Sequence, residues 1–597
     1  MCGIIGYIGN RKFVPIARQG LLNLEYRGYD SAGVSFFNGN KIETIKQKGD
    51  VESLFEKFDN GINCHCGIGH TRWATHGVPS DINSHPHTSQ KGFFTIVHNG
   101  IIENYKELKD KYLLGYNFKS ATDTEVIANL FEYFYLQNKN VLNAIKQCVN
   151  ILKGSFALAI LFSEENDRIY FARHKSPLVI GKGKNENFLS SDLIGIGDET
   201  NKYVLVEDFR YGLITINKIE IYDFDGKTHK FEVKTKKKTV FKSGKGSYPH
   251  YMLKEIYDIP LGIKATAKLY ERKDNILNRI PSQFWNDIDQ IVIVACGTSY
   301  HSALIGEKYL KQIANIKCSC KVASEFIYGK EIVNNRSLGV FISQSGETAD
   351  TLTAIKKAKE LGAKTIGITN VQTSSITTVC DYILPLCAGA EIAVASTKAY
   401  NCQLVVLYML ANFLKDHNVS KKCITELITT NSKLQIPYLE EKVEPLIKKL
   451  NKSKNIYMIG RNYDYVTCLE ACLKLKEISY IPCEAYPAGE LKHGTLALIT
   501  KNVPVIAVIT EKDLIDKTMM IVEQVKARGG KVFIFTCFDL SKYNIKDCTI
   551  VKLPDIPYYL KPIYSIIPFQ LLSYKVTLSL GYNPDRPRNL AKSVTVE

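Results

Sequence analysis

The chain opens with the nonapeptide Met1-Cys2-Gly3-Ile4-Ile5-Gly6-Tyr7-Ile8-Gly9. If the initiator methionine is removed, Cys2 carries both a thiol and a free α-amine. An α-amine has a pKa of about 8, so much of it is available as a base at neutral pH. Activation of a nucleophile by the N-terminal amine is a route to covalent catalysis. The alternative is an ordinary buried cysteine, and the sequence that follows Cys2 has to decide between the two.

The composition is that of a globular protein with several domains. At 597 residues the chain is too long for one core and predicts about three or four units. The net charge of +17 arises from 77 Lys and Arg against 60 Asp and Glu. Because no basic-aromatic stripe accompanies this charge, we expect a solvated basic surface that steers anions, and no nucleic-acid partner.

The cysteines and apolar runs favour a cytoplasmic protein. Sixteen cysteines without a signal peptide predict free thiols in a reducing compartment. The longest apolar run, residues 404–414, is shorter than the ~20 residues that span a bilayer. The pairs Cys64/Cys66, Cys318/Cys320 and His85/His87 lack the spacing of zinc sites, so no metal is expected.

Residues 1 to about 240 contain many short apolar segments, such as 93–97 and 156–162, separated by turn signals such as Asn99-Gly100. Helical patterns cover only residues 14–25 and 123–137. Runs of strands with few helices predict a β-sandwich with helices on its outer faces.

Polar clusters interrupt this pattern. Residues 69–77 (Gly-His-Thr-Arg-Trp-Ala-Thr-His-Gly) place a guanidinium among hydroxyls and imidazoles, which suits a substrate carboxylate. Asn99 and Gly100 could donate to an oxyanion, and Asp123 could pair with a substrate ammonium. The alternatives are a hairpin at Asn99-Gly100 and a helix cap at Asp123.

Four motifs together resemble the class II glutamine amidotransferases: residues 2–6 (CGIIG), 25–33 (EYRGYDSAG), 69–77 (GHTRWATHG) and 98–100 (HNG). The resemblance implies an N-terminal-nucleophile αββα sandwich in which Cys2 attacks the glutamine amide. It implies that Asn99 and Gly100 hold the oxyanion, and it assigns glutamine binding to Arg72, Thr75, His76 and Asp123. Trp73 becomes a candidate gate for ammonia.

The second half alternates strands and helices and repeats itself. Residues 234–247 are charged and aperiodic, which predicts a linker. Residues 291–297 are echoed by 456–462, and 361–369 by 528–536. Two doubly wound parallel α/β domains are the economical interpretation, with ligands at the carboxyl ends of the strands.

Two loops of the first copy suit a phosphate. Cys296-Gly297-Thr298-Ser299 and Ser343-Gln344-Ser345-Gly346-Glu347-Thr348 offer hydroxyls and backbone N–H groups at helix starts. The corresponding loop of the second copy contains Glu511, which discourages phosphate. Ordinary helix caps are the alternative.

Further reactive groups suit an aldose–ketose isomerisation with amine transfer. Lys474 and Glu477 share a helix face, His493 lies beside Gly494, and Lys592 is near the C-terminus. Together they supply an amine for a Schiff base, a carboxylate for proton transfer and an imidazole for ring opening. A surface ion pair and a solvated tail lysine are the alternatives.

This half resembles paired sugar isomerase (SIS) domains, and the chain from Cys2 to Glu597 resembles the family of isomerising glutamine–fructose-6-phosphate aminotransferases. The resemblance implies a transferase that needs no cofactor, takes glutamine and fructose 6-phosphate, makes glucosamine 6-phosphate, and channels ammonia between its sites. It implies phosphate contacts from Thr298, Ser299, Ser343, Gln344, Ser345 and Thr348 and a sugar contact from Ser396. Glu477 would transfer the proton, His493 would open the ring, Lys474 would act at the reaction centre, and Lys592 would form the Schiff base.

We therefore expect an amidotransferase domain at 2–240, a linker with helices at 241–284, SIS domains at 285–435 and 448–575, and a tail at 576–597 that completes the sugar site. A homodimer or higher homo-oligomer is expected, because SIS relatives pair through these domains. Two departures from the family pattern are Asn462, where Gly is common, and the segment 581–586, which affects tail docking. The functional alternatives are an amidotransferase with another acceptor, such as a phosphoribosyl donor, and a non-catalytic sugar-phosphate sensor.

Overall fold

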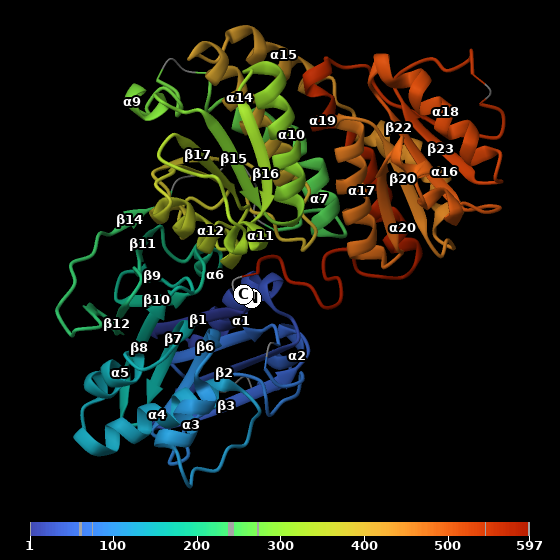
Figure 1. The fold of residues 1–597 in the computed structure, drawn as a ribbon. Helices are drawn as coiled ribbons and strands as arrows, with labels where there is room; N and C mark the ends of the chain where they lie inside the picture. The colour runs from blue at the N-terminus through green and yellow to red at the C-terminus, as the bar shows by residue number, and fades with distance from the viewer. Residues whose placement is uncertain are drawn as a thin grey trace. The chain divides into compact units, whose positions relative to one another are not determined.

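The computed structural model describes residues 2–58, 62–74, 76–236, 244–271, 274–543 and 545–594. The chain forms two compact units, Met1–Lys238 with Ala591–Glu597, and Thr239–Leu590 (Figure 1). Among the residues so described, no helix combines the length and the apolar character needed to cross a membrane.

The N-terminal unit contains two antiparallel sheets. The first has eight strands in the order β14-β11-β9-β10-β1-β4-β2-β3, and the second has six in the order β13-β12-β8-β7-β6-β5. The strands are β1 (Gly3–Gly9), β2 (Ser31–Asn38), β3 (Lys41–Lys48), β4 (Cys66–Arg72), β5 (His87–Thr88), β6 (Phe94–Ile102), β7 (Gly154–Phe162), β8 (Glu165–His174), β9 (Val179–Lys182), β10 (Glu186–Ser190), β11 (Lys202–Leu205), β12 (Arg210–Thr215), β13 (Ile219–Asp223) and β14 (Lys234–Thr235).

Helices cover the outer face of each sheet. The helices are α1 (Phe13–Leu24), α2 (Val51–Phe55), α3 (Tyr105–Tyr112), α4 (Asp123–Asn138), α5 (Val141–Val149) and α6 (Leu193–Ile196), with a 3₁₀ turn η1 (Glu25–Arg27). Alternation along β1 shows the layering, because Ile4 lies in the core between the sheets and Ile5 in the core beneath α1. The αββα sandwich predicted from the sequence is confirmed (Figure 1).

One predicted turn is wrong. Asn99 and Gly100 lie inside β6 and pair with Ala157 and Phe156 of β7. Gly100 adopts φ +133° there, so this Asn-Gly pair shapes a strand end instead of a two-residue hairpin.

The C-terminal unit contains two parallel sheets of five strands, in the orders β16-β15-β17-β18-β19 and β21-β20-β22-β23-β24. The strands are β15 (Gln290–Ala295), β16 (Lys317–Val322), β17 (Ser337–Ile342), β18 (Lys364–Thr369), β19 (Tyr382–Pro385), β20 (Ile456–Gly460), β21 (Cys483–Pro487), β22 (Pro504–Ile509), β23 (Lys531–Thr536) and β24 (Thr549–Lys552). The matching strand orders confirm the predicted duplication of a doubly wound domain.

Helices connect these strands and precede them. They are α7 (Tyr251–Tyr257), α8 (Ile259–Ala267), α9 (Ser282–Trp285), α10 (Gly297–Ile313), α11 (Ala323–Tyr328), α12 (Ala349–Glu360), α13 (Ile376–Val379), α14 (Lys398–Asp416), α15 (Lys421–Ser432), α16 (Ile436–Leu450), α17 (Tyr463–Ser479), α18 (Ile515–Lys526), α19 (Lys561–Ser565) and α20 (Ile567–Ser579), with 3₁₀ turns η2 (Glu490–Lys492), η3 (Thr495–Leu498), η4 (Lys512–Leu514) and η5 (Tyr558–Leu560). The tail predicted from residue 576 thus begins within α20.

Two features of this unit position the sugar-site candidates. Ala295 of β15 pairs with Ile342 of β17, so the loops that follow these two strands begin at the same edge of the sheet. Asp585 docks the segment before Pro587, since its carboxylate accepts the backbone N–H groups of Tyr251 and Met252, each at 2.8 Å. The departure in this segment therefore leaves a specific anchor at the start of α7.

Candidate functional site

Cys2 lies at the start of β1, next to the end of β4. Gly3 pairs with Thr71 across the two strands, which brings the Cys2 thiol to the backbone of Trp73. Cys2 Sγ accepts the Trp73 N–H at 3.3 Å and lies 3.6 Å from the Trp73 carbonyl oxygen. Burial raises the pKa of the Cys2 thiol, while the Trp73 N–H and the Arg72 guanidinium act in the opposite direction. The thiol therefore needs a nearby base to become a nucleophile.

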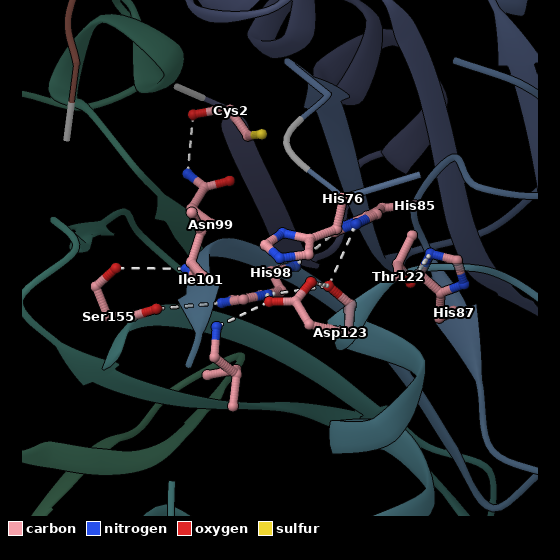
Figure 2. Close-up of polar contacts among 12 residues, drawn as sticks. Cys2, His76, His85, His87, His98, Asn99, Ile101, Thr122, Asp123 and Ser155 are labelled. Carbon is pink, nitrogen blue, oxygen red and sulfur yellow. Dashed lines mark hydrogen bonds and ion pairs between the residues drawn. The ribbon is translucent and has the colours of Figure 1, made fainter. Parts of the chain in front are cut away.

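Asn99 faces Cys2 from β6 of the second sheet. Its Nδ2 donates to the Cys2 carbonyl oxygen at 2.9 Å, as Figure 2 shows. At Gly100 a Cβ would lie 1.9 Å from the Ser155 carbonyl oxygen, so only glycine fits the approach of β6 to β7. The two residues predicted to hold an oxyanion are thus consecutive on β6, and the Asn99 side chain contacts the backbone of Cys2.

Arg72 is buried and keeps one donor unused. Its Nη2 donates to the carbonyl oxygens of His76 and Gly77, the latter at 3.0 Å. Its Nη1 is buried without a hydrogen-bond partner among the described residues. Burial lowers the pKa of Arg72, and the charges of Cys2, Asp30 and Asp123 oppose that shift. An unpaired guanidinium nitrogen beside a thiol suits a ligand carboxylate.

The other glutamine-binding candidates differ in how they are held. Asp123, labelled in Figure 2, is the first residue of α4. Its Oδ2 accepts the Ile102 N–H at 2.8 Å. The Nδ1 atom of His76 is buried and unpartnered within the described ranges, and its ring packs edge-on against Tyr105. Thr75 lies outside the described residues.

Buried histidines that sequence reasoning left without a role surround this site. The rings of His70 and His85 stack at 4.2 Å between centroids, and His98 Nδ1 lies 3.0 Å from Thr124 Oγ1. Across the part of the chain that is described, no three His, Cys, Asp or Glu side chains are placed to hold a metal ion. The one available signal was the high density of histidine between residues 65 and 98.

The two hydroxyl-rich loops of the C-terminal unit lie at the starts of α10 and α12. Ser343 Oγ accepts the Gly346 N–H at 3.0 Å and lies 2.8 Å from Thr348 Oγ1. Gly346 has φ +68°, and a Cβ there would lie 2.0 Å from Ser374 Oγ. Ser299 Oγ accepts a hydrogen bond from Gln403 Nε2 at 2.9 Å. The loop formed by residues 343–348 is therefore a compact, preformed turn with its backbone N–H groups at the start of α12, which suits a phosphate.

The remaining phosphate candidates complete these turns. Ser345 Oγ accepts the Glu347 N–H at 3.2 Å. The Gln344 carbonyl oxygen accepts the Asn370 N–H at 3.1 Å, and Gln344 is half-buried. The bond between Gln344 and Asn370 ties the loop to the residue that follows β18.

Lys474 joins the first loop to α17. Its Nζ donates to Thr298 Oγ1 at 3.0 Å and to Glu477 Oε2 at 2.7 Å, and lies 3.6 Å from Glu470 Oε1. Burial lowers the pKa of Lys474, but the carboxylates of Glu477 and Glu470 outweigh it and leave the pKa raised. Lys474 is 1% exposed, so the surface-ion-pair alternative is wrong.

Three residues of this cluster were missed by sequence reasoning. Glu470 is fully buried and accepts from Thr298 Oγ1 at 3.1 Å, and its other oxygen lies 2.7 Å from His301 Nδ1. Glu391 accepts from Ser396 Oγ at 2.7 Å and from the Thr397 N–H at 2.9 Å. The sequence carried no signal for these contacts, because Glu470 and Thr298 are 172 positions apart.

Two further predicted residues of the sugar site, His493 and Lys592, lie on other segments of the chain. His493 follows η2 and has an exposed side chain. Lys592 is half-buried in the segment Ala591–Glu597, which groups with the N-terminal unit. Their roles in ring opening and Schiff-base formation stay predictions.

In the second sheet of the C-terminal unit, a side chain of the protein occupies the position that corresponds to the phosphate loop of the first. Glu511 accepts the Tyr463 N–H at the start of α17 and the Asn462 Nδ2 group, both at 2.9 Å. Asn462 adopts φ +47°, a left-handed value that glycine adopts with less strain. A carboxylate thus occupies the helix start where a phosphate would bind.

Known proteins match both halves of the chain. The family model described as a SIS domain matches residues 286–413 and 449–580, and that of a glutamine amidotransferase domain matches residues 70–196. The C-terminal domain of glucosamine-fructose-6-phosphate aminotransferase from Francisella tularensis aligns with 58% of this chain and 100% of its own, at a TM-score of 0.54 and 35% identity.

Two curated relatives align over their full length. The glutamine–fructose-6-phosphate aminotransferase (isomerizing) of Caldanaerobacter subterraneus subsp. tengcongensis is 44% identical over 615 residues, and that of Clostridium tetani is 43% identical over 613 residues. In both cases 100% of each chain is covered. The family predicted from the sequence motifs is confirmed. The chain belongs to the glutamine–fructose-6-phosphate aminotransferase (isomerizing) family.

Proposed function

We propose that this enzyme makes D-glucosamine 6-phosphate and L-glutamate from D-fructose 6-phosphate and L-glutamine, the first step toward UDP-N-acetylglucosamine. The observation that carries the proposal is that a chain matching this family over its full length keeps both sets of reacting groups. One set is Cys2 with the unused Arg72 donor, and the other is the Lys474–Glu477 pair beside Thr298.

Glutamine is hydrolysed at Cys2 after Met1 is removed. The thiol transfers its proton to the Cys2 α-amine and attacks the side-chain amide carbon. Asn99 Nδ2 and the Gly100 N–H stabilise the oxyanion. The amine then protonates the departing nitrogen, and ammonia leaves. Water hydrolyses the thioester to glutamate and restores the thiol.

Glutamine is oriented through its α-carboxylate and α-ammonium. Arg72, together with Thr75 and His76, binds the carboxylate, and Asp123 binds the ammonium. The unpaired Nη1 of Arg72 supports this assignment.

The sugar reaction adds the nitrogen and moves one proton. Thr298, Ser299, Ser343, Gln344, Ser345 and Thr348 hold the phosphate, Ser396 contacts the sugar, and His493 assists ring opening. Lys592 forms a Schiff base with the C2 carbonyl and releases water, and ammonia then displaces the Lys592 amine to give the C2 imine. Glu477 takes the proton from C1 and returns it to C2, and the proton that the C1 hydroxyl loses goes to the imine nitrogen. The imine and C1 alcohol thereby become the amine and C1 aldehyde without any net oxidation. Lys474 holds the Glu477 carboxylate, as their 2.7 Å contact suggests.

The proposal also covers the path of ammonia, the oligomeric state and the cellular location. Ammonia passes within the protein from Cys2 to the sugar, with Trp73 as the gate. The chain works as a homodimer or higher homo-oligomer. Its sixteen free cysteines support a location in the reducing cytoplasm.

Replacement of Cys2 by Ala tests the proposal. We expect Cys2→Ala to lose glutamine-dependent glucosamine 6-phosphate formation by at least about 10³-fold, because the nucleophile is gone. Isomerisation of fructose 6-phosphate to glucose 6-phosphate without glutamine should stay within about twofold, because it uses the other reacting groups. Glutamine-driven product in the Cys2→Ala protein would refute the nucleophile assignment.

The same assay separates the alternatives. Glutaminase activity without amino sugar would favour another acceptor, such as a phosphoribosyl donor. Sugar-phosphate binding without any turnover would favour a sensor.

A further inference from the structure

His70 is a buried residue of β4 that the proposed mechanism leaves without a role. Its ring is fully buried and stacks on His85 with an interplanar angle of 20°. Burial lowers the pKa of His70 to about 3, so the imidazole is neutral at every pH at which the enzyme would work. A neutral imidazole carries one N–H and one acceptor nitrogen.

The neighbours of His70 determine which nitrogen carries the hydrogen. His70 Nε2 lies 3.0 Å from the His98 carbonyl oxygen and 3.1 Å from Asn99 Oδ1. Both atoms are acceptors, so Nε2 must be the protonated nitrogen. His70 Nδ1 is buried and has no partner in the described part of the chain, as expected for the unprotonated nitrogen.

The orientation of Asn99 follows from the opposite side of the same amide. Asn99 Nδ2 is 2.9 Å from the Cys2 carbonyl oxygen, which can only accept (Figure 2). The amide oxygen therefore points to His70, and the NH₂ group points to Cys2 with a second hydrogen available. If the amide rotated by 180°, its oxygen would face the Cys2 carbonyl oxygen and any oxyanion formed beside the thiol, which is repulsive.

We propose that His70 is a positioning residue, whose Nε2–H holds the Asn99 amide with its NH₂ group toward the reacting carbon of glutamine. The inference rests on the proposed roles of Cys2 and Asn99. His85 supports the His70 ring by stacking, and is itself held because its Nδ1 accepts the His98 N–H at 3.3 Å. His70 touches no substrate atom, and it acts by making one of two amide orientations unfavourable.

Two amide replacements of different length test this role. In His70→Gln the side-chain amide NH₂ can reach the position of Nε2, whereas in His70→Asn it is one methylene too short. We expect His70→Asn to lower the kcat of glutamine hydrolysis by about 10- to 100-fold, less than the loss of the oxyanion donor itself. KM for glutamine should change less than about threefold, because the carboxylate and ammonium contacts do not involve His70. His70→Gln should recover most of the kcat.

Two further readouts separate positioning from a structural or acid–base role. In an Asn99→Ala background His70→Asn should have little further effect on kcat, because the group that His70 orients is gone. The pH profile of kcat/KM should keep its shape in His70→Gln, because His70 does not titrate in this range.

Some results would overturn the inference. They are wild-type kcat in His70→Asn, equal losses in His70→Gln and His70→Asn, an effect confined to KM, or additive losses with Asn99→Ala. Cys2→Ala is measured in parallel. If Cys2→Ala keeps glutaminase activity, the proposed function fails; if it is inactive while His70→Asn is fully active, only the role of His70 fails.

Discussion

Gly100 combines a φ of +133° with a backbone approach that leaves no room for a side chain, because a Cβ would meet the Ser155 carbonyl oxygen. Gly39 offers a matched control, since it has φ +62° with nothing within 4 Å of its Cβ position. We expect Gly39→Ala to cost about 1–2 kcal/mol from the backbone conformation alone. Gly100→Ala should lose more unfolding free energy, because a clash with β7 is added to backbone strain of about 1–3 kcal/mol.

Thermal unfolding and glutaminase assays on the two variants check this difference. Gly100→Ala should lower the unfolding midpoint of the N-terminal unit further than Gly39→Ala and should abolish glutamine hydrolysis. Equal midpoints and retained activity would mean that β6 can move away from β7, and that the proposed oxyanion donors are less rigid than their packing indicates.

At the scale of the element, the sequence predicted the helices and strands that follow from hydrophobic periodicity and from the spacing of repeated segments. The helical patterns at 14–25 and 123–137 correspond to α1 (Phe13–Leu24) and α4 (Asp123–Asn138). The strand–helix repeats of the second half predicted both parallel sheets. The turn at Asn99-Gly100 was wrong because pairing with β7 overrode the local preference of the dipeptide. Glu470 and His70 were missed because buried polar contacts depend on partners distant in sequence.

Helix α17 carries a buried aspartate that makes the unfolding free energy of the protein depend on pH. Asp464 lies in the first turn, and its oxygens accept the Thr510 N–H at 2.8 Å and the Thr510 hydroxyl. Burial raises the pKa of Asp464 from 3.8 to about 7. The folded protein therefore binds more protons than the unfolded chain between pH 4 and 7, and stability falls as pH rises through this window. Three pH units correspond to about 4 kcal/mol at most.

Asp464→Asn should remove this dependence, since an amide can keep both contacts with Thr510 without titrating. We expect the unfolding free energy of the variant, relative to that of the wild type, to rise by about 2–3 kcal/mol between pH 5 and pH 8, because only the wild type loses stability in this range. Asp513→Asn, at an exposed position of η4, is the control and should show no such trend. A wild-type stability that is flat from pH 5 to 8, relative to Asp464→Asn, would contradict the raised pKa.

At the scale of the whole molecule, the proposed function requires that nitrogen released at Cys2 reach a sugar bound by the other unit. The family match establishes that both halves occur in one chain, with the relatives covered over their full length. Coupling is a property that neither half shows alone. It appears as a ratio of products, because each ammonia that escapes leaves glutamate without a matching amino sugar.

Trp73→Ala tests whether this residue gates the ammonia. Both contacts of Trp73 to the Cys2 thiol use backbone atoms, so truncating its side chain leaves them in place. We expect glutamine hydrolysis within about threefold of wild type, and a ratio of glutamate to glucosamine 6-phosphate that rises from about 1 to well above 2, since ammonia leaks to solvent.

Trp285→Phe is the matched control, because Trp285 is buried against Phe284 and Phe413 and its replacement should leave the ratio near 1. Free ammonia should account for the excess glutamate, and it is measured in a separate sample by the NADH-dependent reductive amination of 2-oxoglutarate, followed as oxidation of NADH. A ratio that stays at 1 in Trp73→Ala would refute the gating role of Trp73. It would not bear on the proposed roles of Cys2 and Glu477.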